Sequence, residues 1–117
     1  MGSKSRTKGR AYEQRIARAY RERGYEAKRG WQSREGDDDP DVVLNIPLWI
    51  ECKHHAKGGL TFRAYTQACE AAPLSHAPIV HIHEDRGAHL VVLSEHDWFR
   101  VLEHAAPTLF DEGKGDR

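Results

Sequence analysis

Hydrophobic and polar residues follow two different periods along this chain. Between residues 9 and 23 the apolar residues recur every three or four positions, which predicts an amphipathic helix, and Gly24 follows as its end. Elsewhere, short apolar runs are bounded by Gly, Pro, Asn and Asp, which predicts strands and turns. Thr61 and Ser94 stand where helix N-caps belong. The expected elements are a helix at 9–23, strands at 25–31, 40–44 and 48–53, a helix at 61–72, strands at 78–83 and 88–93, and a helix at 94–104.

This order, α-β-β-β-α-β-β-α, predicts an α/β fold with a mixed, mainly antiparallel sheet flanked by helices. With 117 residues the chain has room for one core, so we expect a domain at 9–106, a basic flexible arm at 1–8 and a loose tail at 107–117. No apolar run approaches the roughly 20 residues of a membrane span, and the polar N-terminus lacks the apolar stretch of a secretory signal. We therefore expect no membrane partner and a cytoplasmic location, in the host cytoplasm or nucleoid if a phage encodes the chain.

The net charge of zero conceals a polarised sequence. Residues 1–34 hold eleven Lys or Arg and three acids, whereas residues 35–51 hold six acids and no base. A basic segment beside an acidic one is typical of phosphate binding next to a cation site. A solvated helix face beside a polar loop has the same composition and stays open as the alternative.

The predicted strand at 48–53 places two charged residues on one face. Because side chains alternate along a strand, Glu51 and Lys53 share a side with Trp49. If Ile46 is the middle of the preceding turn, Asp41 lies directly opposite Glu51 on the same side of the sheet. Like charges in that position repel, and a divalent cation between them would convert the repulsion into coordination.

A third carboxylate comes from the first predicted helix. At 100° per residue, Glu13 lies in the middle of the apolar stripe with Ile16 and Tyr20, away from the charged residues. A carboxylate buried without a partner is costly. Glu13 therefore either forms a buried salt bridge or points across the core towards Asp41 and Glu51.

Three carboxylates and a lysine suit the hydrolysis of a phosphodiester. Carboxylate and water ligands select Mg²⁺, with Mn²⁺ as a substitute, over zinc. Lys53 would position or help deprotonate the attacking water and stabilise the charge of the transition state, unless it forms a plain ion pair with Glu51. Zinc is the competing metal hypothesis, although no C-x₂-C pair supports it. Its candidate ligands are Cys52, His54, His55 and either Cys69 or His76.

These residues resemble a known motif. Pro40-Asp41, a nine-residue gap and Glu51-Cys52-Lys53 are similar to the PD-(D/E)xK nuclease motif, with Glu13 in the preceding helix. The resemblance implies a restriction-endonuclease-like core.

A longer stretch, roughly residues 8–103, resembles the archaeal-type Holliday junction resolvases. The resemblance implies that Asp41 and Glu51 bind the metal with support from Glu13 and that Lys53 is catalytic. It also implies that Ser33 contributes to cleavage and that Gln67 lies near the active site. The family is homodimeric and uses Mg²⁺ to nick two opposed strands of a four-way DNA junction. The matching positions are Lys8-Gly9-Arg10, Glu13-Gln14-Arg15, Gly24-Tyr25, Arg29, Ser33 and Gln67-Ala68.

The chain departs from the resolvases in the loop at 34–39, where three aspartates replace the more Gly/Ser-rich, basic loop usual in that family. Aspartates near a scissile phosphate repel DNA unless metals or basic residues compensate. Two alternatives to a resolvase therefore remain, another PD-(D/E)xK nuclease of repair or restriction type and a catalytically silent DNA-binding protein. In each case we expect phosphate contacts, without sequence readout, from basic residues. These are Lys4, Arg6, Lys8, Arg10, Arg29 and Arg34.

Overall fold

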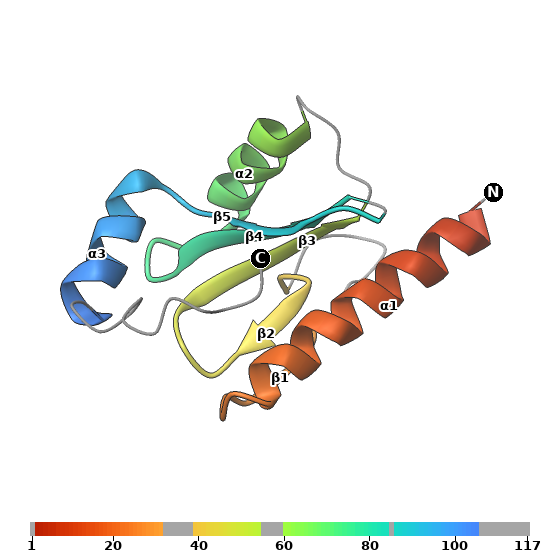
Figure 1. The fold of residues 1–117 in the computed structure, drawn as a ribbon, viewed down its shortest axis with the longest axis horizontal. Helices are drawn as coiled ribbons and strands as arrows, with labels where there is room; N and C mark the ends of the chain where they lie inside the picture. Colours follow the sequence, from red (N-terminus) through yellow and green to blue (C-terminus); the bar gives the residue numbers. More distant parts are fainter. Residues whose placement is uncertain (1, 32–38, 55–59, 85, 106–117) are drawn as a thin grey trace.

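The structure is a computed structural model that describes residues 2–31, 39–54, 60–84 and 86–105, with the backbone alone at 2–8 and 105. Its elements follow the expected order of helices and strands (Figure 1). They are α1 (Gly2–Arg21), β1 (Ala27–Arg29), β2 (Val42–Leu44), β3 (Leu48–His54), α2 (Leu60–Ala71), β4 (Ala77–His83), β5 (His89–Val92) and α3 (Glu95–Ala105).

The five strands form a single sheet in the order β1-β2-β3-β4-β5. Only the β3–β4 pair is parallel, and the other three pairs are antiparallel. A parallel pair needs a crossover between its strands, and α2 supplies it. The predicted α/β fold with a mixed, mainly antiparallel sheet is therefore confirmed.

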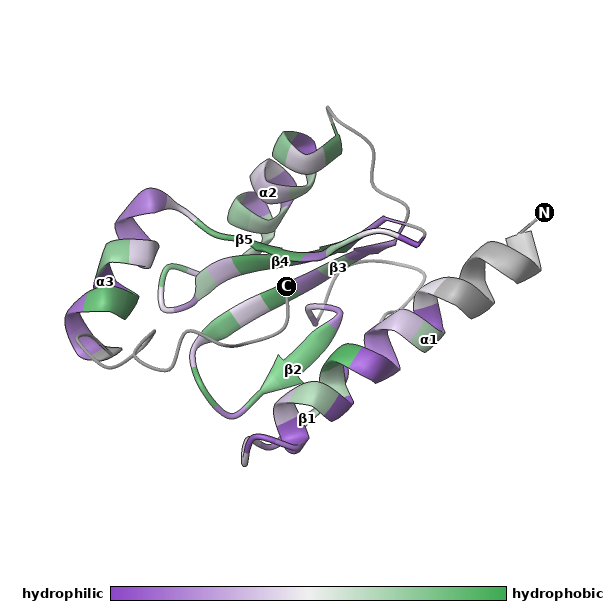
Figure 2. Ribbon diagram, in the orientation of Figure 1, coloured by the Kyte–Doolittle hydropathy of each residue, from purple (hydrophilic) through white to green (hydrophobic). Residues whose placement is uncertain are grey.

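The two faces of the sheet are covered by different helices. On one face α1 packs Tyr12 and Ile16 against Val42 and Ile50. On the other, α2 packs its buried alanines against Trp49 and the middle of β4. The alternation along β3 explains this division, because Ile50 and Trp49 are neighbours in sequence and point to opposite faces. Figure 2 shows the matching alternation of hydrophobic and hydrophilic positions around α1.

Helix α1 differs most from its prediction. It begins at Gly2, seven residues before the expected start, so its backbone continues through the segment expected to be a flexible arm. It ends at Arg21, and Gly24 follows with φ at +95°, a left-handed conformation that glycine adopts without strain. Strand β1 is shorter than the predicted 25–31, because only three residues pair with β2.

Helix α3 begins as predicted behind Ser94, whose Oγ accepts a hydrogen bond from the backbone N–H of Asp97 at 3.0 Å. It lies at the end of the sheet where β3 and β4 start, and it leaves Phe99 and Val101 exposed (Figure 1). Within the part of the chain that the structure describes, no helix is long and apolar enough to cross a membrane.

Candidate active site

The β2–β3 hairpin places two acids opposite each other. Val42 pairs with Ile50 across the antiparallel ladder, which confirms the register expected from the turn at Ile46. Asp41 and Glu51 are the flanking residues of that pair, so they face one another on the side of the sheet that α2 covers. Asp41 is buried, with 9% of its surface exposed, although it carries a carboxyl group.

Each acid is held by a donor from β3. The backbone N–H of Cys52 donates to Asp41 Oδ2 at 2.8 Å, and the indole N–H of Trp49 donates to Glu51 Oε1 at 2.8 Å. Burial raises the pKa of Glu51 to about 8, helped by the charge of Asp41 and by a hydrogen bond between the two carboxyl groups. The Trp49 bond and the charge of Lys53 oppose that rise in pKa. Glu51 therefore keeps its proton to a higher pH than an ordinary glutamate does.

A polar cavity of about 570 Å³ opens in front of this pair. Gln67, expected near the active site from the resemblance, lies on its α2 wall. Glu70 lies on the same wall and was not anticipated. It follows Gln67 by three residues, and that spacing puts two side chains on one helix face, so the signal was present in the sequence. The polar side chains that line this carboxylate cavity are Asp39, Asp41, Glu51, Lys53, Gln67 and Glu70.

Glu13 is near the cavity but does not line it. Its Oε1 accepts a hydrogen bond from Arg29 Nε at 3.0 Å, so the salt bridge considered from the sequence is present. Burial and the charge of Asp41 raise the pKa of Glu13, whereas Arg29 lowers it. The charge of Asp41 therefore raises the pKa of Glu13, although Glu13 forms a salt bridge with Arg29. Its role as a metal ligand stays a prediction.

The carboxylate cavity fits a hard cation better than zinc. Among the described residues, no group of three or more His, Cys, Asp or Glu is arranged to hold a metal ion. Mg²⁺ does not need such a group, because it is usually bound by one or two carboxylates together with water and substrate phosphates. Asp41 and Glu51 are the facing carboxyl groups of the cavity that could supply these one or two carboxylates. His55, one of the zinc candidates, lies outside the described residues.

The expected DNA contacts are only partly described. Ser33, Arg34 and the side chains of Lys4, Arg6 and Lys8 lie outside the described residues. Arg10 is exposed on α1, and Arg29 is held by Glu13. Of the acidic loop, Asp39 is described, and its Oδ2 accepts the backbone N–H of Trp31 at 2.8 Å.

The opposite face of the sheet carries a second polar group, the histidine row of His54, His83 and His89. The three residues are cross-strand neighbours at the same level of β3, β4 and β5. The rings of His83 and His89 stack with centroids 3.9 Å apart, and the His54 ring lies 5.0 Å from that of His83. Tyr12 of α1 covers the row, with its ring 5.6 Å from His54 and 5.7 Å from His83. Sequence reasoning missed this cluster, because it depends on the β3–β4 register.

His81, two residues before His83 on β4, faces α1 as well. Its Nε2 lies 2.8 Å from the hydroxyl of Tyr20. Burial lowers the pKa of His81 to about 4, and burial raises the pKa of Tyr20 to about 12. Both groups are therefore neutral in the folded protein at neutral pH.

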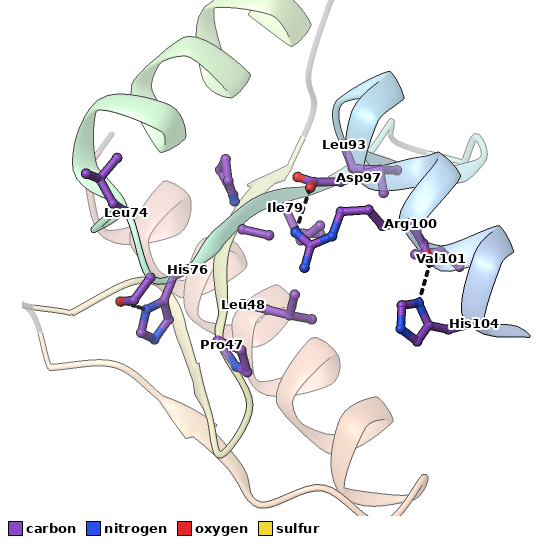
Figure 3. Close-up of a pocket in the computed structure, with 13 residues that line it drawn as sticks. Pro47, Leu48, Leu74, His76, Ile79, Leu93, Asp97, Arg100, Val101 and His104 are labelled. Atoms are coloured by element: carbon purple, nitrogen blue, oxygen red, sulfur yellow. Dashed lines mark hydrogen bonds and ion pairs between the residues drawn. The ribbon is translucent and has the colours of Figure 1, made fainter.

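A different cavity, of about 480 Å³, lies between α3 and the starts of β3 and β4 (Figure 3). Leu48, Ile79 and Val101 contribute apolar side chains to it. Its charged residues are already engaged, since Arg100 pairs with Asp97 at 3.5 Å. The residues that line this cavity include no pair of facing acids.

Comparison of the chain with protein-family models, with curated proteins and with solved structures finds no match.

Proposed function

We propose that this chain is a Mg²⁺-dependent DNA endonuclease with a PD-(D/E)xK core, and that it resolves four-way junctions. One observation carries the proposal. Asp41, directly before β2, faces Glu51 of β3, and Lys53 lies two residues further along β3 on the same face, lining the same cavity. Facing acids are unfavourable in a plain sheet, so this arrangement is accounted for by a ligand that carries positive charge.

Each polar residue of the cavity would have a different role in phosphodiester hydrolysis. Bound Mg²⁺ would supply Lewis-acid polarisation of the phosphate and a lowered pKa for water. Asp41 and Glu51 would hold it, after Glu51 releases the proton that it keeps in the metal-free protein. The ammonium group of Lys53 would orient the attacking water and stabilise the charge that develops on the phosphate. Gln67, on the opposite wall, would hydrogen-bond the same phosphate.

The choice of a junction rests on the resemblance to the archaeal-type resolvases. Arg10 of α1 and Arg29 of β1 would contact backbone phosphates. Such contacts give affinity without sequence readout. A homodimer would present two such cavities and cut two opposed strands symmetrically. Ser33 and Arg34 precede Asp41 in the sequence. In the same proposal, Ser33 would contribute to cleavage and Arg34 would contact a backbone phosphate.

The experiment is incubation with a labelled, immobile four-way junction in Mg²⁺ and in EDTA, beside a linear duplex with the sequence of one arm. We expect paired symmetric nicks in the junction with Mg²⁺, no cleavage with EDTA and little cleavage of the duplex. Equal cutting of duplex and junction would instead identify another nuclease of this type. Binding without cleavage in both Mg²⁺ and Mn²⁺ would identify a catalytically silent DNA-binding protein and overturn the proposal.

A further inference from the structure

Trp49 occupies a position in β3 that joins the hydrophobic core to the carboxylate cavity. Its ring is buried, with 8% of its surface exposed, among Ala64, Ala68 and Val80. Its indole N–H nevertheless has a polar partner, Glu51 Oε1, at 2.8 Å. Because the two residues are separated by one position on the strand, both side chains point to the α2 face.

This hydrogen bond restricts the Glu51 side chain. A glutamate has three rotatable side-chain bonds, and one fixed oxygen removes most of the freedom of the carboxyl group. The indole is itself fixed by the packing of α2 on the sheet. The position of the Glu51 carboxyl group is thereby tied to the core of the protein and to the facing Asp41, with which it forms a hydrogen bond.

We propose that Trp49 is a positioning residue for the metal site, which holds Glu51 ready to bind Mg²⁺ opposite Asp41. The inference rests on the proposed function and extends it by one residue that acts through Glu51. Donors that fix a metal-ligating carboxylate typically change metal affinity by about 10- to 100-fold when they are removed.

The test replaces Trp49 by Phe, which keeps an aromatic ring in the core and removes the N–H donor. Mn²⁺ affinity is measured by calorimetry on the metal-free protein, and the Mg²⁺ concentration for half-maximal junction cleavage is measured separately. We expect affinity about 10-fold weaker or more and a matching rise in the half-maximal Mg²⁺ concentration. The cleavage rate at saturating Mg²⁺ should recover, because the chemical groups are intact. Trp31→Phe, at a tryptophan with 71% of its surface exposed, is the control and should change neither quantity.

A purely structural role gives a different result. Trp49→Phe would then lower the unfolding midpoint and the amount of active protein, with an unchanged half-maximal Mg²⁺ concentration, and the inference would be wrong. If Trp49→Phe does not fold, the wild-type protein provides the test by NMR. The indole N–H resonance of Trp49 should shift when Mg²⁺ is added, and those of Trp31 and Trp98 should not. An unmoved Trp49 resonance in a protein that binds Mg²⁺ would also overturn the inference.

These outcomes separate the inference from the proposed function. A wild-type protein that binds neither Mg²⁺ nor Mn²⁺ and cuts no DNA contradicts the proposed function. A wild-type protein that does both, beside a Trp49→Phe variant that behaves identically, contradicts the role of Trp49 alone.

Discussion

The two faces of strand β3 hold polar groups in opposite electrostatic situations. Towards α2, the facing acids Asp41 and Glu51 line a polar cavity, and the pKa of Glu51 is raised by burial and by the charge of Asp41. Towards α1, the histidine row is stacked under Tyr12, and a smaller cavity of about 400 Å³ lies beside His89 and the neighbouring His81. Consecutive residues of the same strand contribute to both groups, since Lys53 points to one side and His54 to the other.

The difference supports the proposal that a ligand binds at the carboxylate cavity. Imidazole and phenol groups can be buried in their neutral forms, and burial shifts His81 and Tyr12 in that direction. His89 also accepts a hydrogen bond from Arg15 at 2.8 Å, which requires an unprotonated ring nitrogen because a guanidinium group only donates. Two facing carboxyl groups repel each other when both are ionised, and a bound cation would remove that repulsion. The proposed function therefore assigns the chemistry to the α2 face and a structural role to the α1 face.

The largest predicted effect comes from substitutions on the α2 face alone, which test whether cleavage depends on the carboxylate cavity. Asp41→Asn, Glu51→Gln and Lys53→Ala should each lower single-turnover cleavage of a four-way junction at least about 1,000-fold, equivalent to about 4 kcal/mol of transition-state stabilisation. Junction binding, measured by gel shift in Ca²⁺, should stay within a few-fold of wild type. Binding depends on the basic residues, so it should survive the loss of catalytic groups.

Glu22→Gln, at an exposed acid in the turn that follows α1, is the matched control and should cut at the wild-type rate. Retained cleavage in any of the three cavity variants would show that the assigned site is wrong.

A second prediction concerns the α1 face and acid. His81 titrates at about 4 in the folded protein against about 6.5 in an unfolded chain, so the unfolded state takes up a proton first as the pH falls. Stability contributed by neutral His81 is therefore present above pH 6.5 and is lost between about pH 6.5 and 4, by about 3 kcal/mol at most. Urea unfolding in EDTA at pH 7 and at pH 4.5 measures the change.

His81→Gln should lose less stability between these two pH values than wild type, whereas His96→Gln, at an exposed position on α3, should behave like wild type. Identical pH dependence in wild type and His81→Gln would remove His81 from the account of acid sensitivity.

The contrast between the faces also explains what the sequence could predict. Asp41 and Glu51 belong to one hairpin, and a short turn centred on Ile46 fixes which residues of the hairpin face each other. Strand alternation then places Lys53 with them. This part of the site follows from local rules, so the register was predictable.

The remaining contacts depend on packing between distant segments. The histidine row requires His54 to pair with His83 in a parallel register, which the packing of α2 sets and no tight turn fixes. Helical periodicity put Glu13 on the buried side but could not indicate that Arg29 of β1 would bind it. The Trp49–Glu51 bond was the exception, because the two residues share a strand face and their proximity was visible in the sequence.

The smallest predicted effect tests whether the α1 face is purely structural. Among the described residues, the buried hydroxyl of Tyr12 has no hydrogen-bond partner, and burial raises its pKa to about 12. Tyr12→Phe should therefore increase the free energy of unfolding by about 1 kcal/mol, because a buried polar group without a partner is removed while the ring stays packed against His83. Tyr20→Phe is the matched comparison and should lower stability by about 1 kcal/mol, because it breaks a 2.8 Å hydrogen bond to His81.

Junction cleavage should stay within about twofold of wild type in both variants, since neither hydroxyl reaches the carboxylate cavity. Equal destabilisation by both substitutions would show that the Tyr12 hydroxyl is bonded after all, and a large loss of cleavage in Tyr12→Phe would assign the histidine row a part in the chemistry.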